Sequence, residues 1–314
     1  MLTALAGGVG AARMLRGLAG VVPPSDITAV VNTADDVILH GLHVSPDLDT
    51  VVYTLGGAND EERGWGLAGE SWTTMEALER YGGETWFRLG DRDLATHLYR
   101  TQRLAQQATL SEVTAEIAAA WGVAVRVLPM SDERVETRIT VAGPRDGTSE
   151  EIGFQEWFVG RRHGEAVEPV ESVRFEGADE SAPAAGVLAA VAAADVVVIC
   201  PSNPIVSIAP VLAVPGVADA VRARRHDVVA VSPIVAGAAL RGPADRLLAD
   251  LGHEVSVVGV ARLYAPYAAR LVVDDADAAL APAVEAEGIR CVVAPTVMKG
   301  PAEAAALARV VVGG

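Results

Sequence analysis

The stretch AAGVLAAVAAADVVVIC, residues 184–200, joins a run of small and aliphatic residues to the short apolar segment DVVVIC. The first part is typical of a buried helix. The second part is rich in β-branched residues without polar alternation, as in a parallel strand covered on both faces. The same order continues to the end of the chain, with strands predicted at DVVAVS (227–232), RLVVDD (270–275) and IRCVVA (289–294).

Two further strands of this kind are predicted near the beginning of the sequence. LTALA (2–6) and ITAVVN (27–32) are apolar and are separated by a helical segment. Alternating strands and helices predict a parallel sheet between two layers of helices. We therefore predict an α/β fold, a Rossmann-like three-layer sandwich with a mostly parallel sheet, whose core is formed by residues 1–50 and 183–314.

The middle of the sequence has a different composition. All five tryptophans and all four phenylalanines lie between residues 65 and 175. Residues 73–121 look mostly helical, and the short alternating runs that follow, such as VAVRVL (123–128) and EIGFQEWFV (151–159), are typical of a β-meander. We predict that residues 51–182 form a cap, first helical and then a β-meander, inserted into the core.

The charge of the chain narrows the classes of function. Its 314 residues carry 41 acidic against 25 basic side chains, a formal net charge of −16. Proteins that bind nucleic acids or anionic membranes without specificity are normally basic, so neither partner is expected. We expect no membrane span and no signal peptide. Cys200 and Cys291 both lie in apolar segments, which favours reduced thiols in a cytoplasmic protein.

A glycine-rich loop follows the first predicted strand. In GGVGAAR (7–13), glycines allow a close approach of the backbone to a ligand, and Arg13 comes one turn into the next helix. The dinucleotide-binding fingerprint is incomplete, because Arg13 replaces its third glycine and the second strand ends in Asn32-Thr33 instead of an acid. An anion site at a helix N-terminus is the better interpretation, and a tight turn without a ligand is the alternative.

Carboxylates follow the second predicted strand. NTADD contains Asp35 and Asp36, and SPDLDT contains Asp47 and Asp49. The carboxyl ends of parallel strands share one edge of the sheet, so these side chains should lie near the glycine loop. Residues two apart in an extended segment point the same way, which would place Asp47 and Asp49 in one site. Carboxylates beside a phosphate loop indicate Mg²⁺, although helix caps and turns also use aspartate.

Two other polar segments have simpler explanations. His40 and His43 in HGLH lack a second Cys/His pair, so a zinc site there is not expected. PSNP (201–204) follows a buried strand and precedes a helix. Ser202 and Asn203 are suitable N-caps, and the same position would also present polar groups to a nucleotide.

Several motifs in order along the chain carry a family resemblance: GGVGAAR (7–13), AVVNTADD (29–36), SPDLDT (45–50), RLGDRDLATH (88–97), LPMSDERVETRI (128–139), FQEWF (154–158), PSNPIVSIAP (201–210) and VSPIVAG (231–237). Together they make the sequence similar to the 2-phospho-L-lactate transferase family of coenzyme F420 biosynthesis, and most similar to its actinobacterial branch. The resemblance implies a Mg²⁺-dependent enzyme that acts on the deazaflavin Fo (7,8-didemethyl-8-hydroxy-5-deazariboflavin), and a homodimer.

The resemblance also implies a reaction. The actinobacterial donor is enolpyruvyl-diphospho-5'-guanosine, and transfer of its enolpyruvyl-phosphate to Fo gives dehydro-coenzyme F420-0 and GMP. The lactyl analogue gives F420-0, and no residue identified in the sequence distinguishes the two donors.

Residue roles follow from the same resemblance. The donor phosphates and guanosine would be bound by Gly7, Gly8, Val9, Gly10, Arg13, Ser202, Asn203 and Ser207. Mg²⁺ would be held by Asp35 and Asp47, and Fo would lie at Asp49 and Arg88. Asp35 and Asp49 are the candidate catalytic carboxylates, one of which orients the attacking hydroxyl or accepts its proton.

Two other functions remain as alternatives. A nucleotide-sugar-binding regulatory protein of the same fold would keep the glycine loop but would not need RLGDRDLATH and LPMSDERVETRI. A metal-dependent glycosyltransferase would use DLD (47–49) as the acidic motif that holds a sugar diphosphate.

Overall fold

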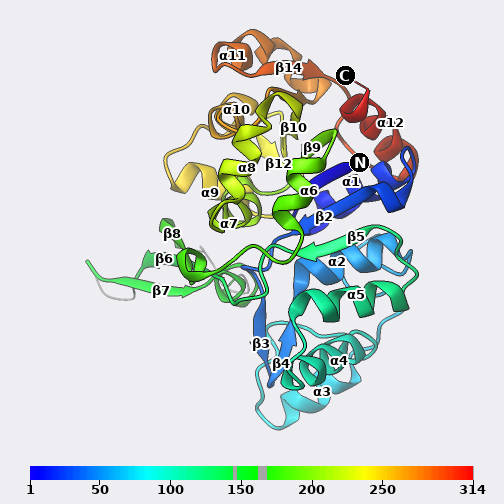
Figure 1. Ribbon diagram of the computed structural model, residues 1–314. Helices are drawn as coiled ribbons and strands as arrows, with labels where there is room; N and C mark the ends of the chain where they lie inside the picture. The colour runs from blue at the N-terminus through cyan, green and yellow to red at the C-terminus, as the bar shows by residue number, and fades with distance from the viewer. Residues whose placement is uncertain (144–146, 162–167, 314) are drawn as a thin grey trace.

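A seven-stranded sheet forms the centre of this computed structural model, which describes residues 1–143, 147–161 and 168–313 (Figure 1). All of its neighbouring strands pair in parallel, as the apolar runs predict. Their spatial order is β14 (Arg290–Val293), β13 (Arg270–Val273), β10 (Val228–Val231), β9 (Val196–Ile199), β1 (Leu2–Ala6), β2 (Ile27–Val31) and β5 (Arg126–Pro129).

Helices cover both faces of the sheet. Successive residues of a strand point to opposite faces, so strands that are apolar throughout need cover on both. Ala4 of β1 belongs to one apolar core and Leu5 to the other. The first core contains α1 (Gly8–Ala19), α2 (Pro46–Leu55), α5 (Leu110–Ala120) and α12 (Pro301–Val312). The second contains α6 (Val187–Ala193), α7 (Ala209–Ala213), α8 (Val217–Ala223), α9 (Ala244–Asp250), α10 (Val257–Tyr264) and α11 (Ala281–Ala286). The predicted three-layer α/β architecture is confirmed.

One strand of the sheet comes from the segment predicted to be the cap. The run VAVRVL (123–128) was assigned to a β-meander, and this was wrong, because β5 pairs in parallel with β2 at the edge of the central sheet. Helix α5, from the same range, also packs into the core. Alternation of polar and apolar residues marks a half-covered strand, and an edge strand of a parallel sheet produces it as readily as a meander.

The end of α2, residues 51–55, also belongs to the core. Most of the rest of residues 51–182, together with β3 and β4, forms two lobes beside the core (Figure 1). A helical lobe contains the hairpin of β3 (Val37–Leu39) and β4 (Leu42–Val44) with α3 (Thr73–Arg80) and α4 (Asp93–Ala105). A β-lobe contains an antiparallel sheet in the order β7 (Ser149–Gly153), β6 (Glu136–Ala142) and β8 (Val170–Glu176). Both kinds of cap structure were predicted.

The segment EIGFQEWFV (151–159) is only partly a strand. Strand β7 ends at Gly153, and Glu156–Gly160 forms a π-helix, so the meander prediction was wrong for the second half of the segment. Phe154, Trp157 and Phe158 pack together there. Their spacing of three and four residues is that of one helix face.

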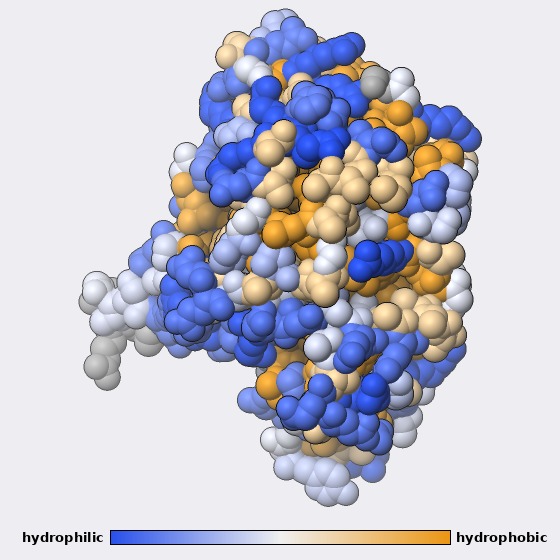
Figure 2. Space-filling view, in the orientation of Figure 1, coloured by the Kyte–Doolittle hydropathy of each residue, from blue (hydrophilic) through white to orange (hydrophobic). Residues whose placement is uncertain are grey.

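Shorter elements complete the part of the chain that the structure describes. The 3-10 turns are Pro24–Asp26, Ala178–Glu180, Arg225–Asp227 and Asp275–Leu280. The other elements are the π-helix Pro204–Ile208 and the small hairpin of β11 (Ile234–Val235) and β12 (Ala238–Ala239). On the face of the molecule in Figure 2, hydrophobic residues gather toward the middle, and hydrophilic residues dominate above and below.

Within the described residues, no single helix has the length and apolar character needed to cross a membrane, while one bent pair, Pro204–Ala213 with Val217–Ala223 at 95°, meets both criteria when taken together.

Candidate active site

The candidate site lies where the order of the strands reverses. Strand β1 has β2 on one side and β9 on the other, so the loops that follow β1 and β9 leave the sheet side by side. The Gly7 amide of the first loop donates to Ser202 Oγ of the second at 3.3 Å. Such a switch point is where open α/β sheets bind their ligands.

A cavity of about 880 Å³ opens at this point. It is lined by every residue that the sequence analysis singled out for a role: Gly7, Gly8, Val9, Gly10, Arg13, Asp35, Asp47, Asp49, Arg88, Ser202, Asn203 and Ser207. The structure thus brings residues from both halves of the core and from the helical lobe into one place. Their individual roles remain predictions.

The glycine loop is shaped first by contacts within the protein. Helix α1 begins at Gly8, which has a positive φ of 71°. A Cβ on Gly7 would lie 2.7 Å from Ser207 Cβ and 2.8 Å from Asp47 Oδ2, and a Cβ on Gly10 would lie 2.2 Å from the Pro201 carbonyl oxygen. Gly7 and Gly10 are therefore required for packing, whether or not the backbone also approaches a phosphate.

Gly10→Ala is consequently expected to lower the free energy of unfolding by about 2 kcal/mol or more, because the Pro201 backbone must move. Urea unfolding measures this change. Gly300→Ala is the matched control, since a Cβ on this glycine, just before α12, meets only the flexible end of Glu303 at 3.3 Å. Equal stability of the two variants would contradict the packing role.

Asp35 and Asp47 lie beside the glycine loop and are both buried. Asn32 Nδ2 donates to Asp47 Oδ2 at 3.0 Å, whereas Asp35 Oδ1 has no hydrogen-bond partner among the described residues. Burial, and then the charges of Asp47 and Asp36, raise the pKa of Asp35 well above its usual range. Burial also raises the pKa of Asp47 to about 6. Two buried carboxylates with raised pKa values, one of which has an unpaired oxygen, fit a divalent cation.

Asp36, the neighbour of Asp35, does not line the cavity. It accepts a hydrogen bond of 2.6 Å from Ser45 Oγ, and burial raises its pKa to about 8. This aspartate therefore acts as a structural partner of the loop before α2.

Asp47 and Asp49 do not point the same way, in contrast to the prediction. The segment is helical, with α2 beginning at Pro46, so residues two apart lie about 200° apart around the axis. Asp47 consequently faces Gly7 and Asn32, and Asp49 faces Arg100 of α4. The two carboxylates line one cavity from different directions.

Asp49 is engaged by Arg100 through both of its oxygens. Arg100 Nη2 donates to Asp49 Oδ1, and Nη1 donates to Oδ2 at 3.1 Å. The Arg100 side chain is only 2% exposed. Because Arg100 engages both oxygens, neither is free to accept a proton without giving up this contact, which disfavours the predicted role of Asp49 as a general base. An orienting role near the acceptor remains compatible with its position.

His97 and Asp93 extend this buried network. His97 Nε2 lies 3.3 Å from Asp93 Oδ2, and Tyr53 donates to Asp93 Oδ1 at 2.5 Å. Burial opposes ionisation of Asp93, but the contact with His97 and the hydrogen bond from Tyr53 bring its pKa below the usual value. Asp49, Asp93 and His97 place three ligand atoms within 4.8 Å of one another. Because Arg100 already supplies a positive charge there, a cation is better accommodated at Asp35 and Asp47.

Four cationic side chains also line the cavity. Arg13 is joined there by Arg63, Arg241 and Lys299, which the sequence analysis did not identify. Each comes from a different segment, and no local motif marks them. Within a chain of net charge −16, this concentration of positive charge indicates an anionic ligand.

Arg88 belongs to the helical lobe and is exposed. Its guanidinium lies over the Trp72 ring at 4.7 Å, and Arg63 lies over the same ring at 5.4 Å. Arg88 therefore lines the cavity from the helical lobe, as His97 of α4 also does.

The residues after β9 act mainly as local supports. Asn203 Oδ1 caps the following π-helix by accepting from the Ile205 amide at 2.9 Å, as the N-cap interpretation predicts. Asn203 Nδ2 is buried and has no partner among the described residues, so it has a free donor beside the cavity. Ser207 is buried against Gly7.

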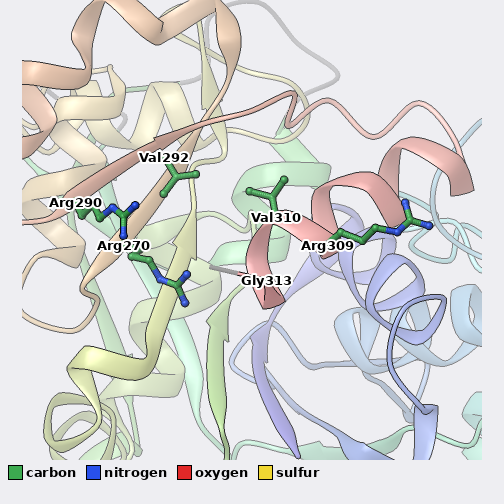
Figure 3. Close-up of a pocket in the computed structure, with 6 residues that line it drawn as sticks. All are labelled: Arg270, Arg290, Val292, Arg309, Val310 and Gly313. Carbon is green, nitrogen blue, oxygen red and sulfur yellow. The ribbon is translucent and has the colours of Figure 1, made fainter.

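A smaller cavity of about 220 Å³ lies at the beginning of β13 and β14 (Figure 3). Arg270, Arg290 and Arg309 line it, and the Arg309 guanidinium points away from the other two. None of the predicted site residues is present. Since parallel sheets bind ligands at the carboxyl ends of their strands, the larger cavity is the candidate active site.

Comparisons with known proteins identify the family of the chain. The model of the family described as 2-phospho-L-lactate transferase CofD matches residues 2–296. The chain belongs to this family. It is 48% identical to the phosphoenolpyruvate transferase of Streptomyces griseus over 98% of this chain and 96% of that protein. It is also 41% identical to the phosphoenolpyruvate transferase of Mycolicibacterium smegmatis over 98% of this chain and 96% of that one.

A solved structure supports the fold of this 2-phospho-L-lactate transferase family member. A protein of the UPF0052 family from Bacillus halodurans superposes with a TM-score of 0.61 over 99% of both chains, at 19% identity. Family membership makes the chain a transferase of coenzyme F420 biosynthesis. The regulatory and glycosyltransferase alternatives are therefore set aside.

Proposed function

We propose that this transferase moves the enolpyruvyl-phosphate group of enolpyruvyl-diphospho-5'-guanosine, or the lactyl-phosphate of its analogue, onto the deazaflavin Fo. The products are dehydro-coenzyme F420-0, or F420-0, and GMP. The observation that carries the proposal is the presence of both signs of charge in the cavity at the glycine loop. Arg13, Arg241 and Lys299 line this cavity, and so do the buried carboxylates of Asp35 and Asp47. A diphosphate together with a divalent cation satisfies both.

The chain's own residues would mainly align the reactants. The N-terminus of α1 and Arg13 would bind the diphosphate, and Asp49, held by Arg100, would orient the ribityl hydroxyl of Fo near Arg88. The hydroxyl loses its proton to solvent as its oxygen forms the new bond to the distal phosphorus, and the bond to the GMP oxygen breaks. Asp35 and Asp47 would hold Mg²⁺, which neutralises phosphate charge when bound.

The identity of the donor is tested by competition. The enzyme would be incubated with Fo, Mg²⁺ and equimolar enolpyruvyl and lactyl donors, and the product mass would be measured. We expect the enolpyruvyl product to predominate, because the curated relatives named above are phosphoenolpyruvate transferases. Exclusive formation of F420-0 would assign the lactyl donor, and transfer only from nucleotide sugars would refute the proposed function. Light scattering would test the predicted homodimer.

Substitutions of Arg88 and of Arg13 should weaken the binding of different substrates. Arg88→Ala should raise the KM for Fo about ten- to a hundredfold and leave the affinity for guanosine diphosphate nearly unchanged, because it removes one charge-assisted contact. Arg13→Ala should have the opposite effect. Titration of each variant with Fo and, separately, with guanosine diphosphate measures both constants. If Arg88→Ala lost affinity for guanosine diphosphate and kept its KM for Fo, the proposed positions of donor and acceptor would have to be exchanged.

A further inference from the structure

Arg13 and Arg241 line the cavity without a carboxylate partner among the described residues. Arg13 Nη1 donates to the Met298 carbonyl at 3.3 Å. Arg241 donates to the carbonyls of Arg63 at 2.5 Å and of Glu62 at 3.1 Å. Backbone carbonyls fix the direction of a guanidinium but leave its charge uncompensated, so both arginines keep their capacity to bind an anion.

The charge of Arg241 also acts on the Arg13 guanidinium. Burial and then the nearby charge of Arg241 lower the pKa of Arg13. Like charges held close together in the wall of a cavity repel, and an anion between them would remove that repulsion. The charge of Glu61 acts on Arg13 in the opposite direction, but the Glu61 carboxylate is already paired with Arg16.

Arg241 additionally connects two segments beside the glycine loop. The turn at residues 60–66 is fixed by Asp60 Oδ1, which accepts from the amides of Glu62 at 3.1 Å and Arg63 at 2.8 Å. A Cβ on Gly64 would lie 2.7 Å from Arg241 Nη1 and 3.0 Å from Val9 Cγ1. Arg241, this turn and Val9 of the glycine loop therefore meet at one point.

We propose that Arg241 is a second phosphate-binding residue, which binds the diphosphate of the nucleotide ligand together with Arg13 while it holds the turn at residues 60–66 beside the glycine loop. The identity of that ligand as a guanosine diphosphate rests on the proposed function. The presence of an anion site between the two arginines does not depend on the proposed function.

Calorimetric titration with guanosine diphosphate and with inorganic pyrophosphate, both in excess Mg²⁺, tests the proposal. Arg241→Ala should weaken binding of both probes about ten- to a hundredfold, the effect of losing one charge-assisted contact. Arg225→Ala is the matched control, because Arg225 also donates to two backbone carbonyls, those of Ala265 and Gly288, but does not line the cavity. The Arg225 variant should bind both probes as tightly as the unmodified protein does.

Arg241→Lys separates charge from the connecting role. Lysine keeps the positive charge but cannot reproduce the forked contact with two carbonyls, so it should recover part of the lost affinity. Lysine and alanine variants that bind equally weakly would show that Arg241 only supports the turn, and the proposal would be wrong. It would also be overturned if Arg241→Ala bound both probes normally, or if the unmodified protein bound neither.

The same titrations distinguish this inference from the proposed function. If Arg241→Ala loses pyrophosphate affinity but no guanosine-linked donor yields GMP with the unmodified enzyme, the anion site stands and the proposed reaction falls. If GMP is formed and Arg241→Ala binds normally, the reaction stands and the role of Arg241 falls.

Discussion

Asp35→Asn is expected to lower the rate of transfer about a thousandfold or more. The substitution keeps the shape of the side chain but removes the charge that, with Asp47, would hold Mg²⁺ against the diphosphate. Loss of a metal that stabilises developing charge typically costs several kcal/mol of activation free energy, which corresponds to this factor. Partial recovery at high Mg²⁺ is expected, because Asp47 and Asn32 remain in place. Steady-state kinetics across a Mg²⁺ series measures both effects.

The folding of this variant provides the control. Burial and the neighbouring charge of Asp47 both disfavour ionised Asp35, so Asn should not lower the melting temperature in metal-free buffer. An inactive variant with unchanged or raised stability would locate the defect in the site. Full activity of Asp35→Asn at ordinary Mg²⁺ would contradict its role as a ligand.

Arg100→Met should cause the largest loss of stability, about 3–5 kcal/mol in the free energy of unfolding. Arg100 and Asp49 are both buried, and removal of the guanidinium leaves the Asp49 carboxylate without its counterion. Chemical denaturation monitored by circular dichroism measures the loss. Activity should also fall, since Asp49 loses the contact that fixes its orientation.

Arg103→Met is the matched control, one turn further along α4. Its ion pair with Glu116 lies at the surface, with side chains 30% and 36% exposed, and such pairs contribute little to stability. The free energy of unfolding of the Arg103 variant should therefore be close to that of the unmodified protein. Similar losses in the two variants would show that the buried pair has no special stabilising role.

Much of the fold could be predicted because parallel strands have a strong local signature. The apolar runs that become β9, β10, β13 and β14 could each be located from a few residues. The position of the glycine loop and of Asp35 followed from the rule that ligands bind beyond the carboxyl ends of such strands. The placement of these residues in one cavity required no information beyond the order of the strands.

The different directions of Asp47 and Asp49 could also have been predicted. Proline is favoured at the first position of a helix, and Pro46 follows Ser45 in SPDLDT. Reading this as a helix start would have separated the two carboxylates. The extended interpretation overlooked that signal.

The contacts of Arg100 and Arg241 could not be predicted from local patterns. Arg100 reaches Asp49 from 51 positions along the chain, and Arg241 reaches Arg63 from 178. Their partners depend on how the helical lobe and the second half of the core are placed around the sheet, and no short motif encodes that placement.

The central claim is that the enzyme transfers a phosphate-linked group from a guanosine diphosphate donor to Fo in one cavity, which is lined by charges of both signs. The most direct measurement is GMP release, followed by chromatography, in reactions containing enzyme and either donor with and without Fo and Mg²⁺. We predict GMP in an amount equal to the phosphodiester product, and only when Fo and Mg²⁺ are both present. No GMP from either donor in the complete reaction, or GMP release that is independent of Fo, would contradict the account.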